Sequence, residues 1–194
     1  MKQYQDLLNT ILENGTPHED RTGVGTISYF GYQTRFNLQE GFPIITSKSV
    51  PFRWVAEELF WFLSGSTDEG DLRAKGVDIW AEWATKEQTE NFGRDEGDLG
   101  PIYGYLWRNF DGDYPVNDEN PGFDQIKWLI KEIKENPNSR RLLVSAWNPL
   151  QAVQGTISPC LPPCHTLFQF KVENEKILHC QLYQRSADAF LFRN

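Results

Sequence analysis

One cysteine in this sequence is preceded by two prolines and stands where a nucleophile can be held rigidly. Cys164 follows Pro162 and Pro163 and comes just before a segment rich in aromatic residues. The prolines restrict the backbone on the approach to the thiol, and a strand after it would hold the sulfur at one point of a cleft. A cysteine nucleophile reacts as the thiolate. Taken alone, the motif is equally compatible with a buried structural cysteine, because buried free cysteines are common.

The same motif offers a poor set of ligands for zinc. Cys160 and Cys164 are followed by His165, but a structural zinc site needs four ligands at suitable spacing. The remaining cysteine and histidines are scattered along the chain: His18, His179 and Cys180. We therefore expect that this protein binds no metal.

Arg185 is expected to lie opposite Cys164 on a neighbouring strand. Asn174-Glu175 sits midway between two segments of alternating polarity, and a two-residue turn there would pair Cys164 with Arg185 directly. A guanidinium beside a thiol favours the thiolate form. A turn that differs by one residue would move Arg185 to the other face, so the pairing depends on the turn.

Glu58 is a candidate for proton transfer. On a helix, its surface neighbours would all be apolar: Trp54, Val55, Trp61 and Phe62. Burial among such residues penalises the charged carboxylate, so we expect the pKa of Glu58 to be raised. A carboxyl group of this kind can donate and accept a proton near neutral pH. The alternative is a structural ion pair between Glu58 and a distant arginine.

Several arginines are candidates for binding an anion such as a phosphate. They lie in a glycine-rich turn and at the ends of expected strands: Arg21, Arg140, Arg141 and Arg185, the last followed by Ser186. A guanidinium fork matches phosphate oxygens, and a serine hydroxyl adds a donor. Taken singly, each is better explained as a surface or salt-bridge arginine. Only their proximity in the fold would indicate an anion site.

The elements that must position these residues are helices and strands that do not alternate regularly. Periodicity and residue type predict helices over 2–14, 51–64 and 124–136, and strands over 26–36, 141–147, 165–173 and 177–186. The helix over 51–64 is apolar on nearly every side, so we expect it to be buried. Polar residues at 85–98 and 110–122 predict surface loops. The pattern favours an α+β fold over strict β-α-β alternation.

Composition narrows the class of protein further. The chain has 194 residues, with 19 Lys and Arg against 27 Asp and Glu for a net charge of −8, and 14% of its residues are aromatic. This length fits one domain over residues 1–194, and the aromatic content argues against disorder. There is no apolar run of membrane-spanning length, no signal-peptide pattern and no even set of cysteines. We expect a soluble cytoplasmic protein with no membrane partner, and the acidic charge argues against broad nucleic-acid binding.

Taken together and in order, a set of short motifs resembles the thymidylate synthase family. They are DRTG (20–23), RFNL (35–38), GFP (41–43), ELFWFL (58–63), IWAEW (79–83), LGPIYG (99–104), SRR (139–141), VSAWN (144–148), PCH (163–165) and QLYQRSAD (181–188). Each motif is weak alone, but the ordered set is specific and spans nearly the whole chain. The resemblance implies an α+β fold whose large mixed sheet packs against its copy across a two-fold axis, with flanking helices.

The resemblance implies a reductive methylation of dUMP to dTMP, in which 5,10-methylenetetrahydrofolate gives both the carbon and a hydride. Cys164 would attack C6 of the uracil ring, and C5 would then capture the folate methylene. Glu58 would relay protons at O4 and C5, with Tyr103 in the same polar network. Arg185 beside the cysteine would take part in the catalytic group.

The resemblance also implies binding roles and a partner. Arg21, Arg185 and Ser186 would bind the substrate phosphate together with Arg140 and Arg141 of the partner subunit, so an obligate homodimer with shared active sites is expected. The remaining implied contacts are His165, Gln184 and Asp188 for the substrate, and Lys48, Trp80, Trp83 and Asp188 for the folate.

The sequence departs from the family pattern in three places. Residues 46–51 differ from the usual basic loop after Lys48, and residues 111–122 look like an insertion. After Leu191 the expected continuation is replaced by Phe192-Arg193-Asn194, from which we expect a truncated or partial chain, for example one from a coding segment interrupted by an intervening sequence. Two alternatives stay open: a dCMP hydroxymethylase, which adds water in place of hydride, and a non-catalytic fragment that binds nucleotide or RNA.

Overall fold

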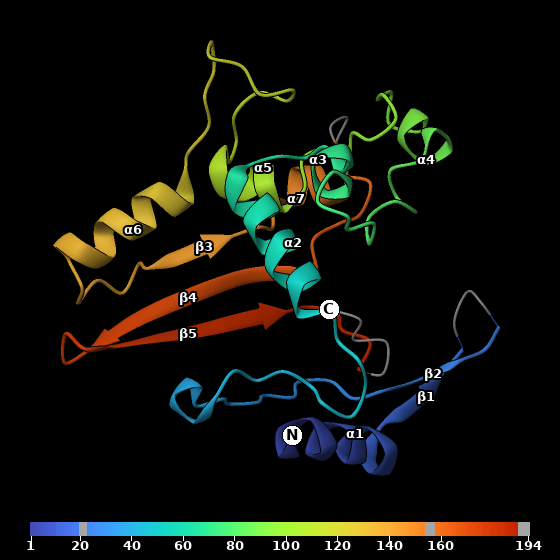
Figure 1. Cartoon of the computed structure of the whole chain (residues 1–194), viewed down its shortest axis with the longest axis vertical. Helices are drawn as coiled ribbons and strands as arrows, with labels where there is room; N and C mark the ends of the chain where they lie inside the picture. Colours follow the sequence, from blue (N-terminus) through green and yellow to red (C-terminus); the bar gives the residue numbers. More distant parts are fainter. Residues whose placement is uncertain (20–22, 154–157, 190–194) are drawn as a thin grey trace. The chain divides into compact units, whose positions relative to one another are not determined.

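The computed structural model describes residues 1–19, 23–153 and 158–189 (Figure 1). They form two compact units, Met1–Phe52 with Ala187–Asn194, and Arg53–Ser186. The single domain over residues 1–194, expected from the chain length, stays a prediction. In the described part of the chain, no helix is long and apolar enough to cross a bilayer.

The first unit begins with helix α1 (Lys2–Asn14), as predicted for residues 2–14. The Gly15 N–H donates to the Ile11 carbonyl and ends the helix. A two-stranded antiparallel sheet follows, formed by β1 (Thr16–His18) and β2 (Thr26–Ser28), and then the short helix η1 (Leu38–Glu40). The predicted strand over 26–36 is therefore wrong beyond Ser28. Gly31 has a positive φ of 83°, which breaks the extended run.

The second unit combines helices with one antiparallel sheet of strand order β3-β4-β5. The helices are α2 (Phe52–Ser64), α3 (Glu69–Arg73), α4 (Lys86–Glu90), α5 (Tyr103–Arg108), α6 (Gln125–Glu135) and α7 (Pro149–Val153), and the strands are β3 (Leu143–Ser145), β4 (His165–Glu173) and β5 (Ile177–Gln184). The α+β class is confirmed, with small sheets where a large mixed sheet was expected. The predicted loop over 85–98 contains α4, whereas 110–122 is a loop, closed at its base by a bridge between Phe110 and Phe123.

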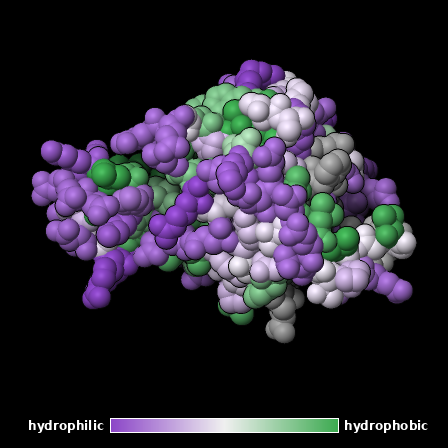
Figure 2. Space-filling model, turned by 90° about the horizontal axis from the view of Figure 1, so that it is seen from below, coloured by the Kyte–Doolittle hydropathy of each residue, from purple (hydrophilic) through white to green (hydrophobic). Residues whose placement is uncertain are grey.

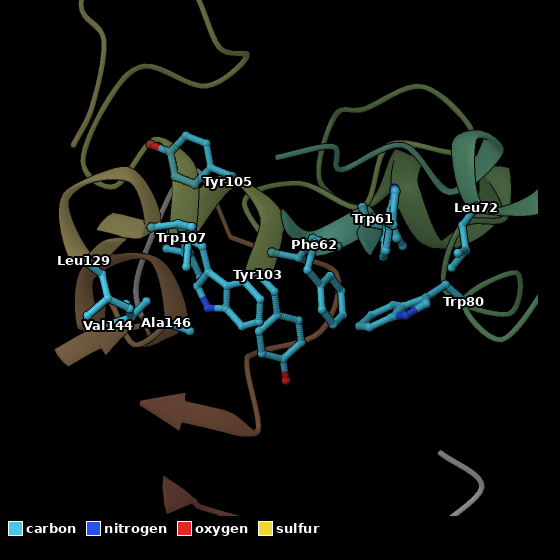
Figure 3. Close-up of a cluster of buried hydrophobic side chains, with 14 of the residues drawn as sticks. Trp61, Phe62, Leu72, Trp80, Tyr103, Tyr105, Trp107, Leu129, Val144 and Ala146 are labelled. Atoms are coloured by element: carbon cyan, nitrogen blue, oxygen red, sulfur yellow. The ribbon is translucent and has the colours of Figure 1, made fainter. Parts of the chain in front are cut away.

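The core of the second unit is an aromatic cluster around α5 (Figure 3). Tyr103 through Trp107 are all buried, and α2 adds Trp61 and Phe62. The prediction that α2 is buried on nearly every side is wrong, because Leu59 and Phe60 are 47% and 63% exposed. Phe62 of α2 packs against Tyr103 and Trp107 of α5. Hydrophobic and hydrophilic residues lie side by side on the face seen in the space-filling view (Figure 2).

Candidate active site

The hairpin of β4 and β5 places Cys164 opposite Arg185, as predicted. The Arg185 N–H donates to the Cys164 carbonyl at 3.0 Å. The predicted two-residue turn is wrong, however: Glu173 pairs with Ile177, so the turn has three residues, 174–176. The pairing is restored by an irregularity between His165 and Leu167, which adds one residue to β4. A β-bulge therefore sets the position of the cysteine, as is common next to active sites.

The Arg185 guanidinium holds the two prolines before the cysteine. Its Nε donates to the Pro163 carbonyl at 2.8 Å and its Nη2 donates to the Pro162 carbonyl at 2.9 Å. The guanidinium carbon also lies 5.5 Å from the centre of the Trp147 ring. These contacts fix the turn that carries Cys164. Stabilisation of the thiolate by this guanidinium, expected from the sequence, stays a prediction.

Tyr103 connects the start of β4 to the aromatic core. Its hydroxyl oxygen accepts hydrogen bonds from the Cys164 N–H at 2.7 Å and from the His165 N–H at 3.2 Å. The side chain comes from the buried helix α5, and its hydroxyl points out of the cluster of aromatic rings (Figure 3). Burial raises the pKa of Tyr103 to about 12, and the two N–H donors oppose the rise only in part. The hydroxyl therefore keeps its proton near neutral pH and can donate it to a further acceptor.

Glu58, on α2, is a half-buried carboxyl group with an indole partner. The Trp80 Nε1–H donates to its Oε1 at 2.7 Å. Burial raises the pKa of Glu58, and the hydrogen bond from Trp80 lowers it by less. The raised pKa confirms the expectation from its apolar neighbours. Among the described residues no arginine or lysine forms an ion pair with Glu58, and its proton-transfer role stays a prediction.

Tyr103 lies between the two candidate catalytic groups. Its ring centre is 4.7 Å from that of Phe62 and 6.4 Å from that of Trp80, the indole that binds Glu58. The His165 ring centre lies 5.6 Å from that of Tyr103. Burial lowers the pKa of His165, which favours the neutral imidazole. The negative charges of Glu58 and of a Cys164 thiolate both raise the pKa of Tyr103, so both groups act on it electrostatically.

The predicted phosphate ligands are not brought together in the described residues. Arg140 and Arg141 are exposed at the turn before β3. Leu143 pairs with Gln169, five residues along β4 from Cys164. Arg141 lies two residues further from the cysteine, which at about 3.3 Å per residue is roughly 20 Å along the strands. Within one chain, these arginines and Arg185 are therefore at opposite ends of the sheet.

The other predicted ligands come from both units of the chain. Arg21 lies outside the described residues, and Lys48 and Asp188 belong to the first unit. Gln184 Nε2 donates to the Ser186 carbonyl at 2.9 Å. Of the two tryptophans expected at the folate, Trp80 is only 8% exposed and Trp83 is half-buried.

Sequence reasoning missed three contacts of this site. Nothing in the sequence pattern linked Trp80 to Glu58, Trp147 to Arg185, or the Tyr103 hydroxyl to the backbone at Cys164. All three side chains lie in motifs that the resemblance had singled out, which was the only signal available. Two surface hollows of about 260 and 420 Å³ are lined by residues between Gly65 and Val116, and neither includes Glu58, Cys164 or Arg185.

Cys160, Cys164 and Cys180 are free thiols. In the described ranges no group of three or more His, Cys, Asp or Glu side chains could hold a metal ion. In comparison with known proteins, a model of the family described as thymidylate synthase matches residues 2–193. The match covers both units and every motif on which the resemblance rests. The chain therefore belongs to the thymidylate synthase family.

Proposed function

We propose that this protein methylates dUMP reductively to dTMP. The folate co-substrate, 5,10-methylenetetrahydrofolate, supplies one carbon and a hydride. The observation that supports this reaction most is the Tyr103 hydroxyl, which binds the backbone of Cys164 and shares its aromatic surroundings with the carboxyl group of Glu58. A nucleophile and a proton-transfer group are thereby attached to one rigid core.

In this proposal the Cys164 thiolate forms a bond to C6 of the uracil ring, and the electron pair of the C5–C6 double bond moves toward C5 and O4. C5 becomes nucleophilic enough to take the folate carbon. Loss of the C5 proton then breaks the bond from this carbon to the folate nitrogen and leaves an exocyclic methylene. Hydride transfer from tetrahydrofolate to the methylene completes the methyl group, oxidises the folate to dihydrofolate and releases the sulfur from C6. The guanidinium of Arg185 keeps the proline turn in place while the sulfur bond forms and breaks. A covalent route of this kind replaces one difficult substitution by easier steps.

Glu58 transfers protons at O4 and C5 of the pyrimidine. Its raised pKa brings the group closer to neutral pH than an ordinary glutamate, so both protonation states are accessible during turnover. Tyr103 remains protonated and donates a hydrogen bond to the same polar network. Neutral His165 borders the tyrosine and contacts the substrate.

The proposed phosphate site uses Arg21, Arg185 and Ser186 of one chain and two arginines of a second copy. The distance along the strands between Arg141 and Cys164 supports this division, because Arg140 and Arg141 are too far along the sheet to serve their own cysteine. The protein then works as a homodimer with shared sites. Gln184 and Asp188 complete the substrate contacts, and Lys48, Trp80, Trp83 and Asp188 contact the folate.

Covalent trapping tests the proposal. The protein is incubated with 5-fluoro-dUMP and methylenetetrahydrofolate, because fluorine at C5 cannot leave as a proton and the adduct accumulates. We expect a mass increase that maps to Cys164, loss of the adduct in Cys164→Ser, and an unchanged adduct in Cys180→Ser, whose thiol is exposed on β5. A folded, dimeric sample without an adduct would overturn the proposal. Turnover of dCMP with incorporation of water, in place of dUMP methylation, would support the hydroxymethylase alternative.

A further inference from the structure

The segment that leads to Cys164 is anchored at its beginning by an arginine for which the proposed reaction has no use. Arg94 lies in the loop after α4, and its Nη2 donates to the Ser158 carbonyl at 2.5 Å. Its Nη1 lies 4.0 Å from the Cys160 sulfur. Arg94 therefore contacts the chain four to six residues before the nucleophile.

The guanidinium of Arg94 is packed between two aromatic rings and a glycine. Its carbon lies 5.3 Å from the ring centre of Phe92 and 5.5 Å from that of Tyr114. A Cβ atom built on Gly100 would overlap the guanidinium, so the guanidinium lies directly against this glycine. The positive φ of 75° at Gly100 disfavours any other residue there. Within the described ranges Arg94 has no carboxylate at ion-pair distance. Its donors serve the 158–160 segment instead of a salt bridge.

Residues 98–100, which contact this segment, take part in a second group of hydrogen bonds. The Cys160 N–H donates to the Leu99 carbonyl at 3.0 Å. The Asp98 carboxylate accepts from the Gly100 N–H at 2.8 Å and from the Tyr114 hydroxyl. Tyr114 belongs to the 110–122 loop, so this loop is attached to the support beneath the cysteine segment.

We propose that Arg94 is a positioning residue for Cys164. The segment from Ser158 to Pro163 is held at both ends, by Arg94 at Ser158 and by Arg185 at Pro162 and Pro163. The two prolines make the last part stiff, so a shift at its beginning is passed on to the sulfur. This inference rests on the proposed function, because it assigns Arg94 a part in placing that nucleophile.

The test compares Arg94→Ala and Arg94→Lys with Arg53→Ala. Arg53 is a matched control, since its guanidinium also donates to backbone carbonyls, those of Lys75 and Gly76, on an exposed part of the same unit. In Arg94→Ala we expect kcat to fall about 10- to 100-fold with little change in KM for dUMP, as for a displaced catalytic group. Arg94→Lys keeps the charge but not the planar fork, so it should recover only part of the loss.

Hydrogen exchange of the peptide that contains residues 158–164 supplies a reading that does not need activity. Its protection should fall in Arg94→Ala and stay as in the wild type in Arg53→Ala. Unchanged protection together with unchanged kcat in a folded Arg94→Ala protein would overturn the inference. Should Arg94→Ala fail to fold, the same two measurements on Arg94→Lys decide it. A wild type that forms no nucleotide adduct would refute the proposed reaction, while the exchange data would still show whether Arg94 holds the segment.

Discussion

The candidate site has two halves that are built in opposite ways. The half that handles the pyrimidine ring is assembled inside one unit, where Glu58 and the backbone of Cys164 both depend on buried aromatic side chains. The half assigned to the phosphate includes exposed arginines at opposite ends of one sheet, Arg185 at one end and Arg140 and Arg141 at the other. Buried groups gain shifted pKa values from one chain alone, whereas a binding site for two negative charges can be completed by a second subunit.

Removing the nucleophile is expected to have the largest effect on the first half. Cys164→Ser replaces the thiol by a hydroxyl group that is a far weaker nucleophile, so we expect kcat to fall by about 10⁴-fold or more. The measurement is dTMP formation under single-turnover conditions, with binding of dUMP followed in parallel. Binding should persist, because the phosphate half is intact. Retained turnover would show that the two halves have been assigned wrongly.

Glu58→Gln should have the next largest effect. The amide keeps the shape and a hydrogen-bond acceptor for Trp80 but cannot transfer a proton, so kcat should fall about 10²- to 10⁴-fold. Glu57→Gln, on the same helix but next to the candidate rather than at it, is the control and should be nearly silent. Equal losses in the two variants would mean that charge on α2, rather than proton transfer at Glu58, is what the reaction needs.

A mixture of two inactive variants tests the second half. Cys164→Ser and Arg141→Ala are each expected to be inactive as homodimers, but a mixed dimer contains one site with neither change. Random exchange of subunits should restore about one quarter of the wild-type activity. No recovery, despite subunit exchange shown by mass spectrometry, would place the nucleophile and the arginine in the same site of one chain and break the comparison.

Tyr103→Phe sharpens the account of how the first half is held. The change leaves the Cys164 and His165 N–H groups without their acceptor, which should cost about 1–3 kcal/mol of the free energy of unfolding. We also expect kcat to fall, by about 10-fold or more, because the nucleophile is less well placed. Tyr183→Phe, at an exposed position of β5, is the control in urea unfolding and in assays. A stable variant with full activity would show that water replaces the hydroxyl without consequence.

The elements with a clear period were predictable from the sequence, and the contacts between them were not. Helix α1 and strand β4 have the predicted bounds, because their apolar residues recur at helical spacing in one and alternate in the other. Helix α5, which carries Tyr103, was missed. Five of its six residues are buried and one of these is a glycine, so its short sequence shows no helical period of apolar residues. That glycine, Gly104, is required because a Cβ there would overlap the Ser66 carbonyl.

The candidate site shows the same division. The residue types of Glu58 and Cys164 were enough to propose their chemistry, because burial and the proline turn can be read locally. The pairing of Cys164 with Arg185 was predicted correctly, but from a wrong turn. The third turn residue and the β-bulge cancel each other, and neither changes the alternation of polar and apolar residues from which the pairing was predicted. Arg94 was missed because its contacts come from separate segments of the chain, at residues 92, 114, 158 and 160.

The smallest expected effect separates the two halves by pH. Burial raises the pKa of Glu58 above its ordinary value of 4.5, so the folded state holds this proton more tightly than the unfolded state. Its contribution to stability is therefore complete below pH 4.5 and is lost as the pH rises through the higher pKa of the folded state. In Glu58→Gln this part of the decline in the free energy of unfolding should disappear. In Arg140→Ala it should remain, because Arg140 is exposed and lies in a different part of the unit, before β3. Urea unfolding between about pH 4 and pH 8 measures both curves.

In Trp80→Phe, loss of the indole donor removes the interaction that lowers the pKa of Glu58, so the decline in stability should move to higher pH. Parallel curves for the wild type and Glu58→Gln would mean that the pKa of Glu58 is the same in the folded and unfolded states. The assignment of Glu58 as a proton-transfer group would then fail.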